Sequence, residues 1–182
     1  MPFRKPKVLD EKALFDYAVK ALGGRAHSIS DLKRKLYPRA AERKDIDSVM
    51  SRLKQYGYLN DRKYADSFTA SRKEGHGLGS ERVLRELHGK QVPRIVAEQA
   101  VKDAYESSDE SAMADQLLQR KFRGKNLPEF LAEPKNLQAA FRRLRYAGYS
   151  SAVTIRVLKH YTSRAAEIDE TIEDGEPNPE ME

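Results

Sequence analysis

Apolar residues recur at intervals of three and four along most of this chain, a pattern that predicts amphipathic helices. The clearest case lies in residues 57–72. Asn60 can accept hydrogen bonds from the first free backbone N–H groups of a helix, and Asp61 places negative charge near the positive end of that helix. Tyr64 and Phe68 then follow at helical spacing, so we expect both rings to face a core.

The same pattern, with Gly, Pro and capping residues as punctuation, predicts nine helices. Only short stretches such as residues 153–157 are rich enough in β-branched residues to be interpreted as strand, so we predict an all-α fold. The expected helices span residues 10–22, 30–37, 42–56, 60–74, 79–89, 93–106, 108–122, 134–147 and 150–162.

These nine helices fall into three groups of three. Residues 81–96 and 138–153 align without a gap at an offset of 57, which places Leu84 on Phe141 and Val92 on Tyr149. Units of this kind cannot bury their apolar faces alone, so we predict three tandem three-helix repeats that stack into an elongated, curved array. The predicted divisions are a basic extension (1–9), three repeats (10–58, 59–107 and 108–164) and an acidic disordered tail (165–182).

Two glycine-containing segments are predicted to connect helices. Residues 123–133 are expected to be a connection inside the third repeat, with Phe130 and Leu131 packed as a short turn. Residues 75–79 contain three glycines, but neither a Walker pattern nor a preceding strand accompanies them. We therefore expect a helix stop and a flexible joint there, and no phosphate-binding loop.

Charge is distributed unevenly along the chain. The overall net charge is +6, but the eight carboxylates after residue 164 face no Lys or Arg. Residues 1–164, the body of the chain, therefore contain all 34 Lys and Arg but only 20 Asp and Glu, which gives the body a net charge of +14. Such a body attracts nucleic acid or an acidic protein groove, although a solvated basic surface without a partner is the alternative. We expect the tail to screen this charge, so truncation after Arg164 should raise DNA affinity at low salt. A solvated terminus without a role is the alternative.

The residues that carry enzyme chemistry are sparse. There is no Cys, and the four histidines are scattered without metal-binding spacing. Asp61 and Asp66 fall at capping or exposed positions, so we predict no catalysis, no cofactor and no metal. No apolar run is long enough to cross a membrane, and the start lacks the apolar segment of a signal peptide, so we expect a cytoplasmic protein.

A basic binding surface is the remaining candidate. Arg offers a planar fork that binds phosphate or carboxylate with two hydrogen bonds, and a row of such residues could follow a nucleic-acid backbone or an acidic groove. For each residue the alternative is a solvated helix face or local pairing with Glu three or four positions away. The candidate residues are Arg62, Lys63, Arg72, Arg82, Arg85, Arg94, Arg142, Arg143 and Arg145.

Several of these segments together resemble the RecX family of regulators of the bacterial recombinase RecA. The resemblance rests on Tyr-Leu-Asn-Asp-Arg-Lys-Tyr-Ala-Asp-Ser-Phe at residues 58–68, Ser-Asp-Leu-Lys-Arg-Lys-Leu at 30–36, residues 82–87, and Phe-Arg-Arg-Leu-Arg-Tyr-Ala-Gly-Tyr at 141–149. One departure is Gln91, which stands where family members usually carry Gly before the third helix of the middle repeat.

The resemblance implies an all-helical, three-repeat protein, acting as a monomer, that lodges in the helical groove of the RecA filament on single-stranded DNA. It implies that the protein reduces filament growth, ATP hydrolysis, strand exchange and the repressor self-cleavage that governs the DNA-damage response. Binding to single-stranded DNA itself would be weak and independent of sequence.

Two other functions remain open at this point. A helix-turn-helix transcriptional regulator also contains paired helices, but it should prefer one duplex site by roughly 10³-fold or more. A helical adaptor without a nucleic-acid role should keep its partner after nuclease treatment and ignore RecA.

Overall fold

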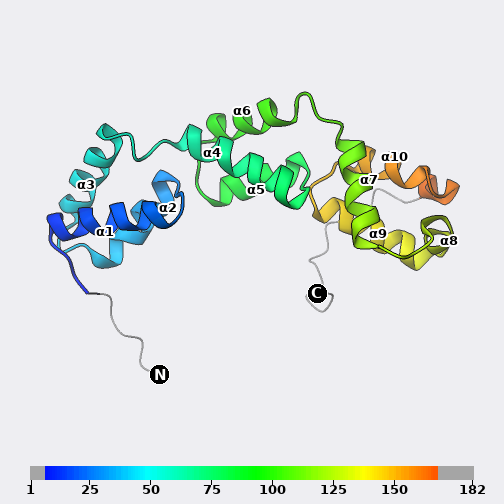
Figure 1. Ribbon diagram of the computed structural model, residues 1–182, viewed down its shortest axis with the longest axis horizontal. Coiled ribbons are helices and arrows are strands. Elements are labelled where there is room, and N and C mark those ends of the chain that lie inside the picture. The colour runs from blue at the N-terminus through cyan, green and yellow to red at the C-terminus, as the bar shows by residue number, and fades with distance from the viewer. Residues whose placement is uncertain (1–6, 168–182) are drawn as a thin grey trace, which may run out of the picture. The chain divides into compact units, whose positions relative to one another are not determined.

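The computed structural model describes residues 7–167, and within them the regular structure is helical (Figure 1). The all-α prediction is therefore confirmed. The helices are α1 (Glu11–Gly24), α2 (Ile29–Leu36), α3 (Arg43–Gln55), α4 (Asp61–Ala70), α5 (Ser80–Gly89), α6 (Arg94–Tyr105), α7 (Glu110–Lys121), α8 (Leu127–Ala132), α9 (Pro134–Tyr146) and α10 (Ser151–Lys159). Shorter turns are the 3-10 helices η1 (Tyr37–Arg39) and η3 (Ser163–Glu167) and the π-helical turn η2 (Ser71–Gly75).

All nine predicted helices are present, and α8 is an additional one. The segment that contains α8 was predicted to be a connection, and this prediction was wrong. Pro128 lies in the first turn of α8, where its fixed backbone angle favours a helix and its missing N–H does no harm. Leu127 and Leu131, four residues apart, are both buried and hold this short helix against the core.

Helix starts are set by the capping residues that the sequence contains. The Ser28 hydroxyl accepts a hydrogen bond from Asp31 N at 3.0 Å, and Asp10 does the same for Ala13 N at 2.9 Å. Asp109 and Ser150 cap α7 and α10 in the same way. The offset of 57 also holds, because α5 and α9 end, and α6 and α10 begin, at residues separated by that number.

The first three helices enclose one core. Here α1 packs against α2 and α3, and buried side chains alternate with exposed ones at helical spacing. The buried residues are Leu14, Ala18, Leu32, Leu36, Ile46, Val49, Met50, Leu53 and Leu59. This core gives the first repeat an apolar centre of its own.

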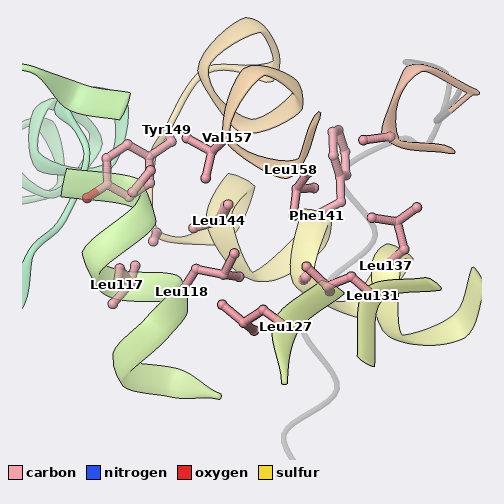
Figure 2. Close-up of a cluster of buried hydrophobic side chains, with 14 residues drawn as sticks. Leu117, Leu118, Leu127, Leu131, Leu137, Phe141, Leu144, Tyr149, Val157 and Leu158 are labelled. Atoms are coloured by element: carbon pink, nitrogen blue, oxygen red, sulfur yellow. The ribbon is translucent and has the colours of Figure 1, made fainter. Parts of the chain in front are cut away.

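Helices α7 to α10 enclose a second core (Figure 2). Leu117 and Leu118 of α7 and Leu144 of α9 belong to this core, and Leu158 of α10 lies beside Phe141 of α9. Leu127 and Leu131 extend this core onto α8. Ala165 in η3 is also fully buried in it.

In α4 the buried centre differs from the prediction. Ala65 is fully buried, whereas Tyr64 and Phe68 are only half-buried and contact each other, with ring centroids 5.8 Å apart. The two aromatic rings therefore flank the buried face of this helix and do not form its centre.

The chain divides into two compact units. The first contains Met1–Phe68 and Glu86–Ala100, and the second contains Thr69–Arg85 and Val101–Glu182. The division passes through α4, α5 and α6, so both units share the middle repeat. The predicted repeat limits at 58/59 and 107/108 stay a prediction. The acidic tail lies outside the described residues from residue 168 onward, as do residues 1–6.

Candidate functional site

The glycine-rich loop of residues 75–79 ends the π-helical turn η2 and leads into α5. Three successive carbonyls of this loop accept hydrogen bonds from side chains of the same compact unit: His76 from Arg120 at 2.8 Å, Gly77 from the Tyr149 hydroxyl at 2.8 Å, and Leu78 from the Tyr105 hydroxyl at 2.6 Å. Burial raises the pKa of both tyrosine hydroxyls, so they remain protonated donors. The helix stop is confirmed. The three bonds tie this loop, for which we predicted a flexible joint, to α6, α7 and the turn after α9.

At the end of this loop two backbone segments come into direct contact. Gly79 N donates to Ala147 O at 2.8 Å, and Glu81 N donates to Gly148 O at 3.2 Å. A Cβ atom on Gly79 would lie 2.3 Å from Gly148 O, and Gly148 itself has φ +94. Only glycine allows so close an approach together with that backbone angle.

Two of the predicted surface arginines belong to this contact. The Arg82 guanidinium lies 4.5 Å from the centroid of the Tyr146 ring and donates to Tyr146 O at 3.3 Å. Arg145 forms an ion pair with Glu81 at 3.0 Å. Both therefore stabilise the folded chain, which limits their use for a partner.

A carboxylate completes the contact at the start of α5. Ser80 N, the first helical amide, donates to Glu110 Oε1 at 2.9 Å, and Glu110 is the first residue of α7. An anion at this position also suits the positive end of the helix dipole. We call the contact of Gly79 and Ser80 with Glu110 and Ala147 the second joint.

An equivalent first joint lies in the other compact unit, at the start of α2. Ile29 N, the first helical amide, donates to Asp61 Oδ1 at 2.9 Å, and Asp61 is the first residue of α4. The Ser28 hydroxyl donates to Lys90 O at 2.7 Å. Lys90 Nζ also lies 3.7 Å from Asp31 Oδ2.

The two joints use the same bonding scheme. In each, the first amide of a repeat's second helix donates to a carboxylate on the first residue of the next repeat's first helix. In each, the residue before that helix donates to a carbonyl in the turn after the next repeat's second helix. Those carbonyls belong to Lys90 and Ala147, which are separated by the same offset of 57. The scheme supports the repeat assignment at atomic detail.

The first and last repeats meet the same requirement differently. In the first repeat, the turn after α2 is paired with Leu9: Leu9 N donates to Arg39 O at 2.7 Å, and Ala41 N donates to Leu9 O at 2.9 Å. In the last repeat, α9 begins at Pro134, which has no N–H to satisfy. The carbonyl of the turn after α2 is thus paired, and the first helical amide of α9 is absent.

The other seven predicted surface residues are distributed over α4, η2, α5, α6 and α9. Arg62 pairs with Asp66 at 3.0 Å, Arg94 pairs with Glu98 at 2.6 Å, and Arg143 lies 5.8 Å from the centroid of the Phe122 ring. Arg72 is half-buried in η2. Of the nine predicted residues, Lys63, Arg85 and Arg142 are exposed, and their side chains form no hydrogen bond or ion pair with another residue of the described range 7–167.

Several residues of the joints were not identified from the sequence. Tyr149 aligned with Val92, and its extra hydroxyl was the only sign that it bonds a distant group. For Glu110, the sequence indicated only a position in the first turn of a helix and no contact with α5. An exposed cluster of aromatic and basic residues lies at the end of α3, around Tyr56 and Tyr58, and was likewise not identified from the sequence.

The part of the chain that the structure describes contains neither a candidate metal cluster nor a membrane-spanning helix. No group of three His, Cys, Asp or Glu side chains there could hold a metal ion. None of the described helices is both long enough and apolar enough to span a membrane.

Comparison with known proteins points to one family. Residues 60–101 match the family model described as RecX, second three-helix domain. The regulatory protein RecX of Vibrio vulnificus (strain CMCP6) is 33% identical over 138 residues, which cover 72% of this chain and 88% of that protein. The regulatory protein RecX of Chlorobium phaeobacteroides (strain BS1) is 33% identical over 99 residues, 54% of this chain and 65% of that protein's length.

The fold is likewise similar to a solved structure. The crystal structure of RecX from Lactobacillus salivarius matches with a TM-score of 0.69 and 15% sequence identity, over 83% of this chain and 96% of that one. At this identity the likeness concerns the fold alone. It agrees with an all-helical chain of repeats.

Proposed function

This chain belongs to the RecX family, and on that premise we propose that it binds the RecA filament on single-stranded DNA and limits what the filament does. Its relatives carry the name regulatory protein RecX, and the RecA partner follows from the family resemblance. The activities to be reduced are filament growth, ATP hydrolysis, strand exchange and repressor self-cleavage. We propose that the protein acts as a cytoplasmic monomer and has no catalysis of its own.

The joint used twice is the observation that carries this proposal. The hydrogen-bonding scheme of Ile29 with Asp61 recurs for Ser80 with Glu110, so successive repeats are connected in the same way. A protein built from similar repeats suits a partner that is itself built from identical subunits, because each repeat can bind an equivalent surface on successive subunits. A recombinase filament on DNA is such a partner.

Charge supports the same partner. The body carries +14, and an electrostatic attraction of this size speeds encounter with DNA or with an acidic groove in a salt-dependent way. Within the predicted surface, Lys63, Arg85 and Arg142 are exposed without a side-chain partner among the described residues, so we assign the binding role to them first. Arg82 and Arg145 have structural roles in the second joint.

Limiting the filament requires differential binding. A ligand shifts a conformational equilibrium only by the difference in its affinity for the two states. The protein must therefore bind a filament state that turns over or disassembles more tightly than the growing state. Binding alone, with equal affinity for both states, would not change RecA activity.

Charge reversal of the exposed residues tests the proposal. We expect the wild-type chain to co-sediment with RecA filaments and to lower the DNA-dependent ATPase at low salt. Arg85→Glu with Arg142→Glu should weaken both effects at least about tenfold, because two favourable contacts become repulsive. Lys121→Glu with Arg156→Glu changes two exposed basic residues outside the predicted surface and serves as the matched control.

Two outcomes would count against the proposal. If the control variant also loses both effects, binding depends on the overall positive charge and not on the predicted surface. A wild-type chain that neither co-sediments with RecA filaments nor changes their ATPase would overturn the function itself.

A further inference from the structure

Two exposed tyrosines stand at the end of α3. Tyr56 is 62% exposed and Tyr58 is 55% exposed. Large aromatic side chains usually have most of their surface buried. The ring centroids of the two tyrosines lie 6.2 Å apart, and Tyr56 lies 6.1 Å from the ring of Phe15 in α1, both in edge-to-face geometry. The three rings form an aromatic cluster on the surface of the first compact unit.

The backbone holds these tyrosines in a fixed position. Tyr58 N donates to Leu53 O at 2.9 Å and Gly57 N donates to Lys54 O at 3.0 Å, bonds that close the end of α3. Gly57 has φ +74, which lets the chain reverse between the two rings. A preorganised pair of rings loses little conformational entropy when it binds a ligand.

Beside the rings lies a hollow with a volume of about 420 Å³. Its lining consists of Phe15, Asp16, Val19, Lys20, Tyr56 and Tyr58. The hollow therefore offers flat apolar surface, one ammonium group and one carboxylate.

Positive charge borders the hollow. The Arg52 guanidinium lies 4.2 Å from the centroid of the Phe15 ring, Lys20 belongs to the lining, and the exposed Lys54 precedes Tyr58 by four residues. Arg52 is partly balanced by Glu11, 3.6 Å away. Over residues 7–58, twelve Lys and Arg stand against seven Asp and Glu.

We propose that this hollow binds single-stranded DNA by stacking a nucleobase against Tyr56 and Tyr58, with the adjacent phosphates near Lys20 and Lys54. Bases stack on exposed aromatic rings in sequence-tolerant sites, and basic residues beside those rings follow the backbone. Asp16 in the wall disfavours a phosphate inside the hollow, so the base enters it and the phosphate stays at the rim. The proposal takes its partner from the proposed function and adds a site that none of the nine predicted residues belongs to.

Charge also favours DNA over the apolar side chain of a protein partner. The rim is basic, and both tyrosine rings carry a polar hydroxyl group. These two features suit a hydrated interface with a polyanion better than a dry hydrophobic interface. A protein partner is then the alternative outcome of the test.

The chain contains no Trp, so one introduced indole reports on a single position. In full-length protein without RecA, a labelled 30-nucleotide oligo(dT) is titrated and its anisotropy reports binding. In parallel, we expect the fluorescence of Tyr56→Trp to be quenched along the same curve, because the indole keeps the stacking surface. Tyr37 is likewise exposed, at 49%, but does not line the hollow. The fluorescence of Tyr37→Trp should therefore not be quenched.

Truncation of the rings gives the second readout. Tyr56→Ala with Tyr58→Ala should raise Kd for the oligonucleotide about tenfold or more, with the salt dependence unchanged. Lys20→Gln with Lys54→Gln should instead reduce the slope of log K against log salt by about 0.7 per lysine. Tyr37→Ala should leave both quantities unchanged.

The proposal is overturned if the indole signal stays constant while anisotropy shows saturation, or if the double alanine variant binds as the wild type does. Absence of any binding to oligo(dT) would overturn it as well. If the double alanine variant keeps its DNA affinity but fails to co-sediment with RecA filaments, the hollow holds a protein side chain. Because the DNA titration contains no RecA, failure of this site and failure of RecA regulation are separate results.

Discussion

The Tyr149 hydroxyl donates a hydrogen bond to the Gly77 carbonyl at 2.8 Å, across 72 residues of sequence. Tyr149 is fully buried, and burial raises its pKa, so the hydroxyl keeps its proton. This bond connects the turn after α9 to the loop before α5 and is one of the contacts that hold the second joint closed.

Replacing this hydroxyl should destabilise the protein. Tyr149→Phe leaves the Gly77 carbonyl without its partner, so we expect the free energy of unfolding to fall by about 1 to 2 kcal/mol. Urea denaturation followed by circular dichroism measures the change. Tyr146→Phe is the control, since Tyr146 is 53% exposed and keeps its ring beside Arg82. Equal stability of the two variants would mean that the Tyr149 bond contributes nothing.

Gly79 should not tolerate even a methyl group. A Cβ atom there would lie 2.3 Å from Gly148 O, so the two backbones must separate, and we expect Gly79→Ala to cost about 2 kcal/mol or more. Gly89, at the other end of α5, has open space around it. Gly89→Ala should therefore be neutral or slightly stabilising, by up to about 1 kcal/mol. Thermal unfolding of both variants gives the comparison, and a Gly79→Ala variant as stable as Gly89→Ala would contradict the close approach.

Gln91 adopts a backbone conformation that glycine adopts more easily. It is exposed with φ 55, and the aligned residue of the last repeat is Gly148. We expect Gln91→Gly to raise the free energy of unfolding by about 1 kcal/mol, because the left-handed conformation costs a residue with a Cβ atom about that much. Gln55→Gly, at the last residue of α3, should have the opposite sign. A loss of stability in Gln91→Gly would show that its side chain makes contacts that outweigh the strain.

Stability should also depend on pH through His27. This side chain is buried, and its Nε2 atom has no hydrogen-bond partner among the described residues. Burial, followed by the charges of Arg25 and Lys35, lowers its pKa below the ordinary 6.5, while Asp31 acts in the opposite direction. The unfolded chain therefore takes up a proton first as the pH falls. The associated stability is complete above about pH 7 and is lost as the pH falls through 6.5 toward the folded-state pKa.

Urea denaturation between about pH 7.5 and 5 measures this dependence. We expect His27→Gln to have a flatter profile than the wild type over that range. The control is His88→Gln, because His88 is exposed at the end of α5 and its replacement leaves His27 in place. Parallel profiles for the wild type and His27→Gln would show that His27 is not the group responsible.

Local sequence signals predicted the helices well, because each cap lies within a few residues of the group that it bonds, as Ser28 does with Asp31. They missed α8, where six residues with a proline contain too few turns to show a periodic pattern. The joints could not be predicted, because Ser80 and Glu110 are 30 residues apart and a single sequence does not pair them.

The predicted binding surface has the same limit. Arg82 and Arg85 lie three residues apart on α5 and look alike in the sequence. In the structure, Arg82 stacks on Tyr146, whereas Arg85 is exposed. The difference depends on a residue 64 positions away from Arg82, so residue type and spacing alone could not separate a structural arginine from a candidate ligand for a partner.

The division of the middle repeat between both compact units has a consequence for fragments of this protein. The chain passes from one unit to the other after Phe68, after Arg85 and after Ala100. No single cut of the backbone can therefore separate the two units and leave both whole. A premature stop codon between residues 69 and 100 would remove the second unit and also part of the first, and a protease that nicks α5 would damage both at once. Shortened chains that end within this stretch should consequently lack parts of both units and should not retain one complete unit.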